Sequence, residues 1–405
     1  MSLSRIRTAS IAFVLVLASP GFAKELPRAT PEDVGMSGRK LMKIDAAVQK
    51  LVDDKKIAGA ITMVARKGRI VHFETYGMRD IEARLPVEKN TIMRFYSMTK
   101  PITTVAAMTL CEQGRFKLDD PVEKHLPELK GAKVYEAGKP VEPTRKVTIR
   151  DLMRHTSGLT YGIFGNSPVD RMYNRAQILG SRNLREMVTK LGRIPLMHQP
   201  GTKWHYSVST DVLGALVERV SRTRLDMFFH KRVFKPLDMR DTAFLVPRAK
   251  VARFSSCYSP GMKTKDRFNA SRYLRQPGFL SGGGGLVSTA RDYMRFCQML
   301  INGGELHGRR VLKAETVRMM TKNQLPQKVH WAGVNGFGLG FSVQLRDLGS
   351  KAHRGEYGWG GAASTHFWIS PKDDLVVVAL SQLMPFSPQL QNLVKPLVYE
   401  AIQKN

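Results

Sequence analysis

The sequence predicts an α/β protein of the α+β type, in which helices flank an antiparallel sheet and a mainly helical region is inserted. Runs rich in β-forming residues lie near both ends of the chain, whereas residues 117–278 are typical of helices and loops broken by proline and glycine. With 405 residues and 42% apolar side chains, the chain can bury a large core. A cleft between the sheet and the inserted region is where a ligand is expected.

The first elements follow from hydrophobic spacing. Apolar residues recur at helical intervals over residues 38–56, and Ser37 precedes them as an N-cap. Residues 57–77 contain two β-rich runs joined at Lys67-Gly68, which predict a hairpin. A helix is then expected in the stretch 94–114, which ends at a glycine.

The C-terminal part supplies the remaining strands. We expect strands at Ser364–Ile369 and Leu375–Ser381 around a turn at residues 371–374, and a last helix from about Ser387 to Gln403. The predicted mature chain, residues 24–405, forms one domain. Its α/β lobe comprises about 34–105 and 285–405, and its helical lobe about 106–284.

Residues 1–23 are typical of a secretory signal peptide. Two arginines precede an apolar run at residues 11–18, and Pro20 and small residues follow, so cleavage is expected after Ala23. The run is short for a membrane span, although an uncleaved anchor is the alternative. The sequence thus predicts an exported protein, periplasmic or secreted.

The formal net charge is +30, from 64 basic and 34 acidic residues. The basic residues are scattered, without long runs or a nucleic-acid-binding module, so we expect no nucleic-acid partner. A generally basic surface favours weak association with an anionic membrane surface.

Three cysteines, Cys111, Cys257 and Cys297, lack close pairing or metal-like spacing. Buried free thiols are expected, and a single disulfide is the alternative. The chain has no H-E-x-x-H or clustered Cys/His pattern, and we expect neither a metal nor a cofactor.

Ser97 and Lys100, in "SMTK", are the strongest candidates for chemistry. At the start of a helix they share one face, and Pro101 fits the first turn, where its missing N–H costs nothing. The following residues are apolar, which predicts a buried Lys100 whose neutral amine could take a proton from the serine hydroxyl. Spacing alone is weak support, because Ser37 and Lys40 have it too. A capping serine beside a surface lysine is therefore the alternative.

Several segments in order resemble the serine β-lactamase and penicillin-binding-protein-like hydrolases, and in particular the class C β-lactamase-like branch that includes family VIII carboxylesterases. They are "SMTK", "TIRDLMRHTSGLTYG", "PGTKWHYSVSTDVLGALVERVS", "GFLSGGGGLVST" and "YGWGGAASTHFWISP". The resemblance runs from about Val34 to Leu383 and implies a β-lactamase-like fold. It also implies that Ser97 is the nucleophile, with Lys100 and Tyr206 as its proton-transfer partners; which of the two is the base stays open. The implied oxyanion hole is the N–H of Ser97 and of Ala362.

Two loops should border this site. We expect Gly282–Gly285 to form a tight loop beside it, and His155 and Ser157 to organise a loop beneath the cleft through hydrogen bonds. Gly360 and Gly361 are expected to let substrate approach the strand backbone closely, with a simple bulge as the alternative.

Two departures from the family pattern bear on the substrate. Trp359-Gly360-Gly361 stands where a lysine-threonine-glycine triplet is usual, so a cation that pairs with a substrate carboxylate is missing. Val208, at a position that the resemblance assigns to substrate binding, stands where an asparagine is usual, so a side-chain amide is missing too. With Trp359 as an apolar wall, these changes favour a neutral ester over a β-lactam or a peptidoglycan stem.

The sequence therefore predicts a serine hydrolase, a carboxylesterase that cleaves small to medium esters through a Ser97 acyl-enzyme. The alternatives are β-lactamase or D-amino-acid peptidase activity, acyl transfer to an alcohol, or a non-catalytic protein that binds cell-envelope material. The combination of Ser97, Lys100 and Tyr206 argues against the last alternative.

Overall fold

A computed structural model describes residues 25–333 and 335–403 of the chain. The predicted signal peptide, residues 1–23 with cleavage after Ala23, lies outside the described residues. Within the described part, no helix combines the length and apolar character that crossing a bilayer requires.

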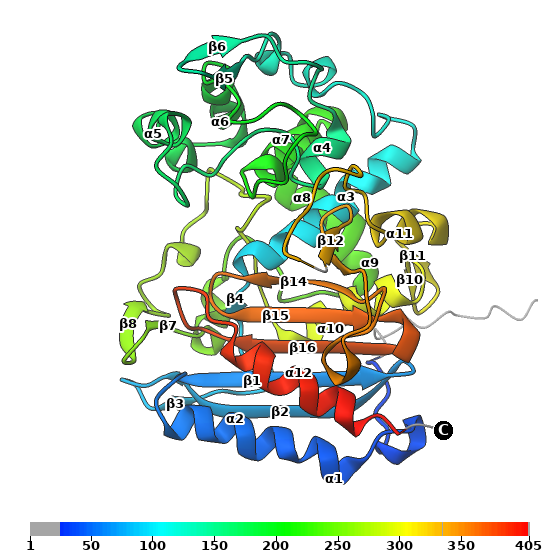
Figure 1. The fold of residues 1–405 in the computed structure, drawn as a ribbon. Coiled ribbons are helices and arrows are strands. Elements are labelled where there is room, and N and C mark those ends of the chain that lie inside the picture. Colours follow the sequence, from blue (N-terminus) through cyan, green and yellow to red (C-terminus); the bar gives the residue numbers. More distant parts are fainter. Residues whose placement is uncertain (1–24, 334, 404–405) are drawn as a thin grey trace, which may run out of the picture.

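An antiparallel sheet forms the base of the molecule, with strand order β12-β13-β14-β15-β16-β1-β2-β3 (Figure 1). Its central pair, β1 and β16, joins the two ends of the sequence, since Ala60 lies opposite Ser381. The predicted sheet built from both ends of the chain is therefore confirmed. Its strands are β1 (Gly59–Arg66), β2 (Arg69–Asp80), β3 (Leu85–Pro86), β12 (Asn335–Phe337), β13 (Ser342–Gln344), β14 (Tyr357–Gly361), β15 (Thr365–Ser370) and β16 (Leu375–Ser381).

Both faces of the sheet are covered by helices. α1 (Gly38–Leu41), α2 (Lys43–Asp53) and α12 (Gln389–Ala401) lie on one face, and α10 (Ala290–Ile301) packs on the other (Figure 1). Each face of the sheet has its own hydrophobic core, and alternate residues of the central strands point into one or the other. Val377 packs in the core beneath α2 and α12, whereas Val376 and Val378 belong to the core on the α10 side. A strand buried on both faces explains the continuous apolar run of β16.

Residues 95–286 are mainly helical, and most of them lie above the sheet in Figure 1. The helices in this range are α3 (Thr99–Glu112), α4 (Ile149–Met153), α5 (Pro168–Arg175), α6 (Leu184–Leu191), α7 (Ser209–Ser221), α8 (Leu225–Phe229) and α9 (Lys235–Leu237). α11 (Ala314–Met320) follows α10. The short strand pairs are β4 (Met93–Arg94) with β9 (Val287–Ser288), β5 (Val134–Glu136) with β6 (Lys139–Val141), β7 (Cys257–Ser259) with β8 (Lys263–Asp266), and β10 (Glu305–Leu306) with β11 (Arg309–Arg310).

Most element boundaries agree with the predictions. The hairpin turn lies at Lys67-Gly68, where both residues have positive φ, and Ser37 caps α1 by accepting from the Lys40 N–H. The first predicted helix is divided at Met42. One predicted strand is displaced by a residue, because Ser364 has a φ of 61° and belongs to the turn before β15.

The cysteines are free thiols: Cys257 and Cys297 are buried, and Cys111 is half-buried. Burial raises the pKa of the Cys257 thiol to about 11 and that of Cys297 well above its usual range. These thiols therefore remain protonated at neutral pH and serve as small core residues.

His366, on β15, makes the folded protein sensitive to acid. The side chain is buried, and burial lowers its pKa to about 4, whereas an unfolded histidine titrates near 6.5. Between these values the unfolded chain binds more protons, so this contribution to stability is complete above pH 6.5 and is lost as the pH falls towards 4. At pH 5 the loss amounts to roughly 2 kcal/mol.

We expect urea unfolding to show this loss between pH 7.5 and pH 5.0 in the wild type, and a smaller loss in His366→Gln. The exposed His230 provides the matched control, since His230→Asn should keep the wild-type pH dependence. Equal pH dependence in wild type and His366→Gln would contradict the assignment.

Candidate active site

Ser97 lies in a one-turn 3-10 helix, η2 (Tyr96–Met98), which leads directly into α3. Tyr96 has a φ of 44°, an uncommon conformation for a tyrosine, and makes the sharp turn that presents Ser97. The Leu286 carbonyl accepts from the Phe95 N–H at 3.0 Å, and the Leu286 N–H donates to Thr99 Oγ1 at 3.1 Å. The turn that carries Ser97 is thus held from both sides.

Lys100 lies one turn further along and is almost completely buried. Its Nζ donates to Ser97 Oγ at 3.2 Å, to Tyr161 Oη at 2.8 Å and to the Gly283 carbonyl at 2.6 Å. Three donated hydrogen bonds are the full complement of an ammonium group. Burial of such a charge is tolerated only because its donors are all satisfied.

Tyr206 approaches Ser97 from the segment that precedes α7. Its hydroxyl lies 2.7 Å from Ser97 Oγ, and Lys100 Nζ lies 4.6 Å from the centre of its ring. Tyr206, which is distant in the sequence, therefore meets Ser97 and Lys100 at one point. Sequence reasoning predicted this grouping.

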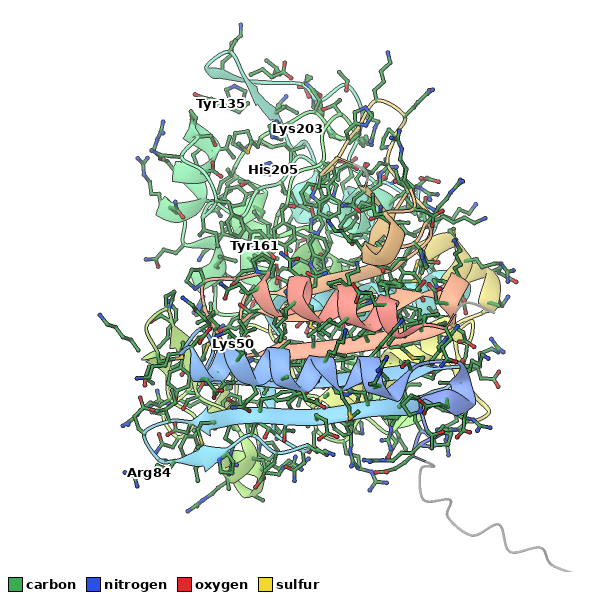
Figure 2. The ribbon with its side chains drawn as sticks, turned by 60° about the horizontal axis from the view of Figure 1, so that its bottom comes forward. Lys50, Arg84, Tyr135, Tyr161, Lys203 and His205 are labelled. Carbon is green, nitrogen blue, oxygen red and sulfur yellow. The ribbon has the colours of Figure 1, made fainter. Side chains whose placement is uncertain are left out.

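Tyr161 is a site residue that sequence reasoning missed. It follows α4, accepts from Lys100, and lies where the helical region meets the sheet-bearing part of the molecule (Figure 2). Burial raises its pKa well above 10, so its phenol remains neutral. The only signal was its place in "TIRDLMRHTSGLTYG", and nothing in that pattern selects a tyrosine that contacts Lys100.

The glycine loop borders the site as predicted, and a buried acid anchors it. Asp211 Oδ1, on α7, accepts from the Gly283 N–H at 3.0 Å and from Ser281 Oγ at 2.6 Å. The same glycine's carbonyl accepts from Lys100. Burial raises the pKa of Asp211, while the nearby Lys100 opposes that shift. Sequence reasoning missed Asp211, which orients the loop that in turn holds Lys100.

His155 and Ser157 hold the loop behind Tyr206, which confirms the predicted structural role. The His155 carbonyl accepts from the His205 N–H at 2.8 Å, and Ser157 Oγ lies 2.7 Å from Ser209 Oγ. The His155 ring is buried 5.0 Å from that of Tyr206. Burial and the positive charge of Lys100 lower its pKa well below 6.5, so the ring stays neutral.

A cavity of about 700 Å³ opens in front of Ser97. Tyr206, Gly283 and Ala362 line it, and so do the side chains of an apolar wall, Ile163, Phe164, Leu179 and Phe279. Ala362 follows the last residue of β14, so Ser97 and Ala362, the two predicted oxyanion-hole residues, border the same cavity. The volume suits a medium-sized organic molecule.

The structure corrects the predicted roles of Val208 and Gly361. Val208 has no exposed surface, because it precedes α7 in the core, so its side chain cannot contact substrate. A Cβ on Gly361 would lie 2.2 Å from the Phe95 carbonyl oxygen. The missing side chain therefore lets β14 pack against the turn that carries Ser97, and it does not make room for substrate.

Gly360 and Trp359 do not line the cavity. The β14–β15 pairing runs without a register shift through Gly360, so the alternative of a bulge is wrong. Trp359 packs its ring 5.6 Å from that of Tyr206 and 5.3 Å from that of Phe337. Contact of Trp359 or Gly360 with substrate stays a prediction.

Comparison with known proteins decides the family. Residues 44–395 match the family model described as Beta-lactamase. This chain belongs to the beta-lactamase family. The resemblance inferred from the motifs and the β-lactamase-like fold are confirmed.

Proteins similar to this chain include ones with and without a stated activity. Protein Rv1367c of Mycobacterium tuberculosis (strain ATCC 25618 / H37Rv) is 36% identical over 361 residues, 84% of this chain and 89% of that protein. Esterase EstB of Burkholderia gladioli is 30% identical over 385 residues, 88% of this chain and 92% of that protein. The solved structure of EstCE1, a hydrolase with promiscuous acyltransferase activity, is 26% identical with a TM-score of 0.78 and covers 89% of this chain and 99% of its own.

Within the described residues, no group of three or more His, Cys, Asp or Glu side chains could hold a metal ion. The side chains gathered around Ser97 are instead hydroxyls, phenols and one amine. Such groups suit nucleophilic attack with proton transfer.

Proposed function

We propose that this protein is a serine hydrolase that cleaves small to medium carboxylic esters through an acyl-enzyme on Ser97. The observation that carries the proposal is the meeting of Lys100 Nζ and the Tyr206 hydroxyl at Ser97 Oγ, at 3.2 and 2.7 Å, on the wall of the cavity. The similarity to Esterase EstB and to the hydrolase EstCE1 supports an ester as substrate.

The proton of Ser97 moves to Tyr206 in this mechanism. The reaction starts from Lys100 as the ammonium, which carries the proton of the Tyr206 phenol and is held by three acceptors, and from Tyr206 as the phenolate. Tyr206 accepts the proton as a phenolate beside the positive charge of Lys100, while Ser97 Oγ attacks the ester carbonyl. The resulting phenol then protonates the departing alcohol.

The N–H groups of Ser97 and Ala362 stabilise the negative oxygen that develops during this attack. Ser97 lies two residues before the first residue of α3, so the helix dipole adds to the positive potential there. Water next attacks the acyl-enzyme while Tyr206 again accepts the proton, and Tyr206 returns this proton to Ser97 Oγ as the acid is released. If an alcohol replaces water, the same steps transfer the acyl group.

Acyl transfer is the second candidate, because EstCE1 combines hydrolase and promiscuous acyltransferase activity. β-Lactam hydrolysis uses the same nucleophile, but Trp359 and Val208 stand where the family pattern has a lysine and an asparagine. Turnover of nitrocefin faster than of any ester would contradict this substrate assignment and leave the Ser97 mechanism standing.

Mass spectrometry of the acyl-enzyme tests the proposal directly. The protein is incubated with 4-nitrophenyl esters of increasing acyl length and with β-lactams, quenched in acid, and digested. In the wild type, we expect the peptide that contains Ser97 to gain the mass of the acyl group. In Ser97→Ala, we expect no peptide to gain this mass. An adduct on another residue, or its persistence in the variant, would remove Ser97 as the nucleophile.

A further inference from the structure

The cavity in front of Ser97 carries positive charge on its wall. Its lining includes Arg182, Arg272 and Arg275 and contains no aspartate or glutamate. Arg182 lies just before α6, whereas Arg272 and Arg275 lie on the segment between β8 and the glycine loop. An ionic group of a bound molecule would therefore meet only cations among the side chains that line this cavity.

The three arginines differ in their partners. Arg182 is paired with Glu186, at 2.8 Å. Arg272 and Arg275 make no ion pair with any of the residues that the structure describes, and both are exposed. The Arg272 guanidinium lies 5.2 Å from the centre of the Tyr273 ring, which supports it at the cavity wall. Two guanidinium groups thus remain available to a ligand.

Ser97, Arg272 and Arg275 line the same cavity, so a substrate whose ester lies at Ser97 can extend towards the two guanidinium groups. The apolar wall of Ile163, Phe164, Leu179 and Phe279 belongs to the same cavity. A ligand could therefore place hydrocarbon against this wall and an anionic end at the arginines.

We propose that the preferred substrate is an ester that carries a carboxylate or similar anionic group remote from the scissile bond, and that Arg272 and Arg275 bind this group. The planar guanidinium matches a carboxylate through paired hydrogen bonds. The inference rests on the proposed esterase function and refines its substrate class. It replaces the expectation of a neutral ester, because the cation missing at Trp359 is supplied by a different segment.

Matched esters test this inference. One substrate is mono-4-nitrophenyl adipate with its free carboxylate, and the other is the same compound capped as a methyl ester. We expect wild type to prefer the acid in kcat/KM, and the ratio of acid to methyl ester to fall about tenfold in the double variant Arg272→Gln/Arg275→Gln. Added salt should lower the wild-type ratio in the same direction.

Two further variants separate charge from structure. Arg272→Lys/Arg275→Lys keeps the positive charge and should recover part of the preference. Arg84→Gln removes an exposed arginine that does not line the cavity and lies apart from the cavity residue Tyr161 (Figure 2), so this variant should keep the wild-type ratio. A loss of preference in Arg84→Gln would indicate that net charge, and not the cavity wall, selects the acid.

The outcomes distinguish this inference from the proposed function. If wild type hydrolyses both esters without preferring the acid, or if the glutamine variant keeps the wild-type ratio, the anionic-substrate inference is overturned and the esterase proposal stands. If wild type hydrolyses neither compound and forms no acyl-enzyme, the proposed function itself fails.

Discussion

Replacing Ser97 by alanine is expected to abolish ester turnover, with a fall in kcat of about 10³-fold or more. The substitution removes the oxygen that forms the acyl-enzyme. It should leave the fold intact, because Ser97 is only half-buried and its hydroxyl hydrogen-bonds, among the described side chains, to Lys100 and Tyr206. Steady-state hydrolysis of 4-nitrophenyl butyrate, with circular dichroism as the check on folding, measures both effects.

The chain contains a matched control for this variant. Ser37 and Lys40 have the same spacing as Ser97 and Lys100, but Ser37 caps α1. Ser37→Ala should leave kcat at the wild-type value and lower the free energy of unfolding by about 1 kcal/mol, since one helix cap is lost. Retention of activity in Ser97→Ala would show that the nucleophile lies elsewhere.

Replacing Tyr206 by phenylalanine is expected to lower kcat by roughly 10²- to 10⁴-fold, the usual range for loss of a general base. Phenylalanine keeps the ring that packs against His155 and Trp359, so the loss reports the hydroxyl alone. The KM should change little by comparison, because the hydroxyl transfers protons during the reaction and does not hold the substrate before it. Initial-rate kinetics across a range of ester concentrations separates the two parameters.

Tyr161→Phe is the natural comparison for Tyr206→Phe. It removes one of the three acceptors of Lys100 and leaves the hydrogen bond between Tyr206 and Ser97 in place. We expect a smaller fall in kcat, of about tenfold, from the weakened placement of Lys100. If Tyr161→Phe proved the more damaging of the two, the Ser97 proton would not pass through Tyr206.

The pairing of Ser97 with Lys100 could be predicted from sequence because it is local. Two residues three apart at the start of a helix share a face whatever the rest of the molecule does. The fold could be predicted for a related reason: alternating and helical hydrophobic periods report burial along each element, and β1 and β16 were recognisable at opposite ends of the chain.

Val208 and Gly361 show where this kind of reasoning stops. The family pattern places both near the substrate, but their surroundings depend on how α7 and β14 pack against other segments. Val208 is enclosed by the core, and the space that Gly361 leaves is filled by the Phe95 carbonyl. A pattern identifies positions along the chain and does not say which atoms occupy the space around them.

By itself, the sequence determined the class of the fold and the candidate nucleophile with its lysine and tyrosine, since these follow from periodicity, spacing and family motifs. Only the tertiary structure decided what surrounds them. It brought Tyr161, Gly283 and Asp211 to the support of Lys100, and Arg272 and Arg275 to the wall of the cavity. The physical reason is that hydrogen bonds and charge act over a few ångströms in space, whereas these residues lie far apart along the chain.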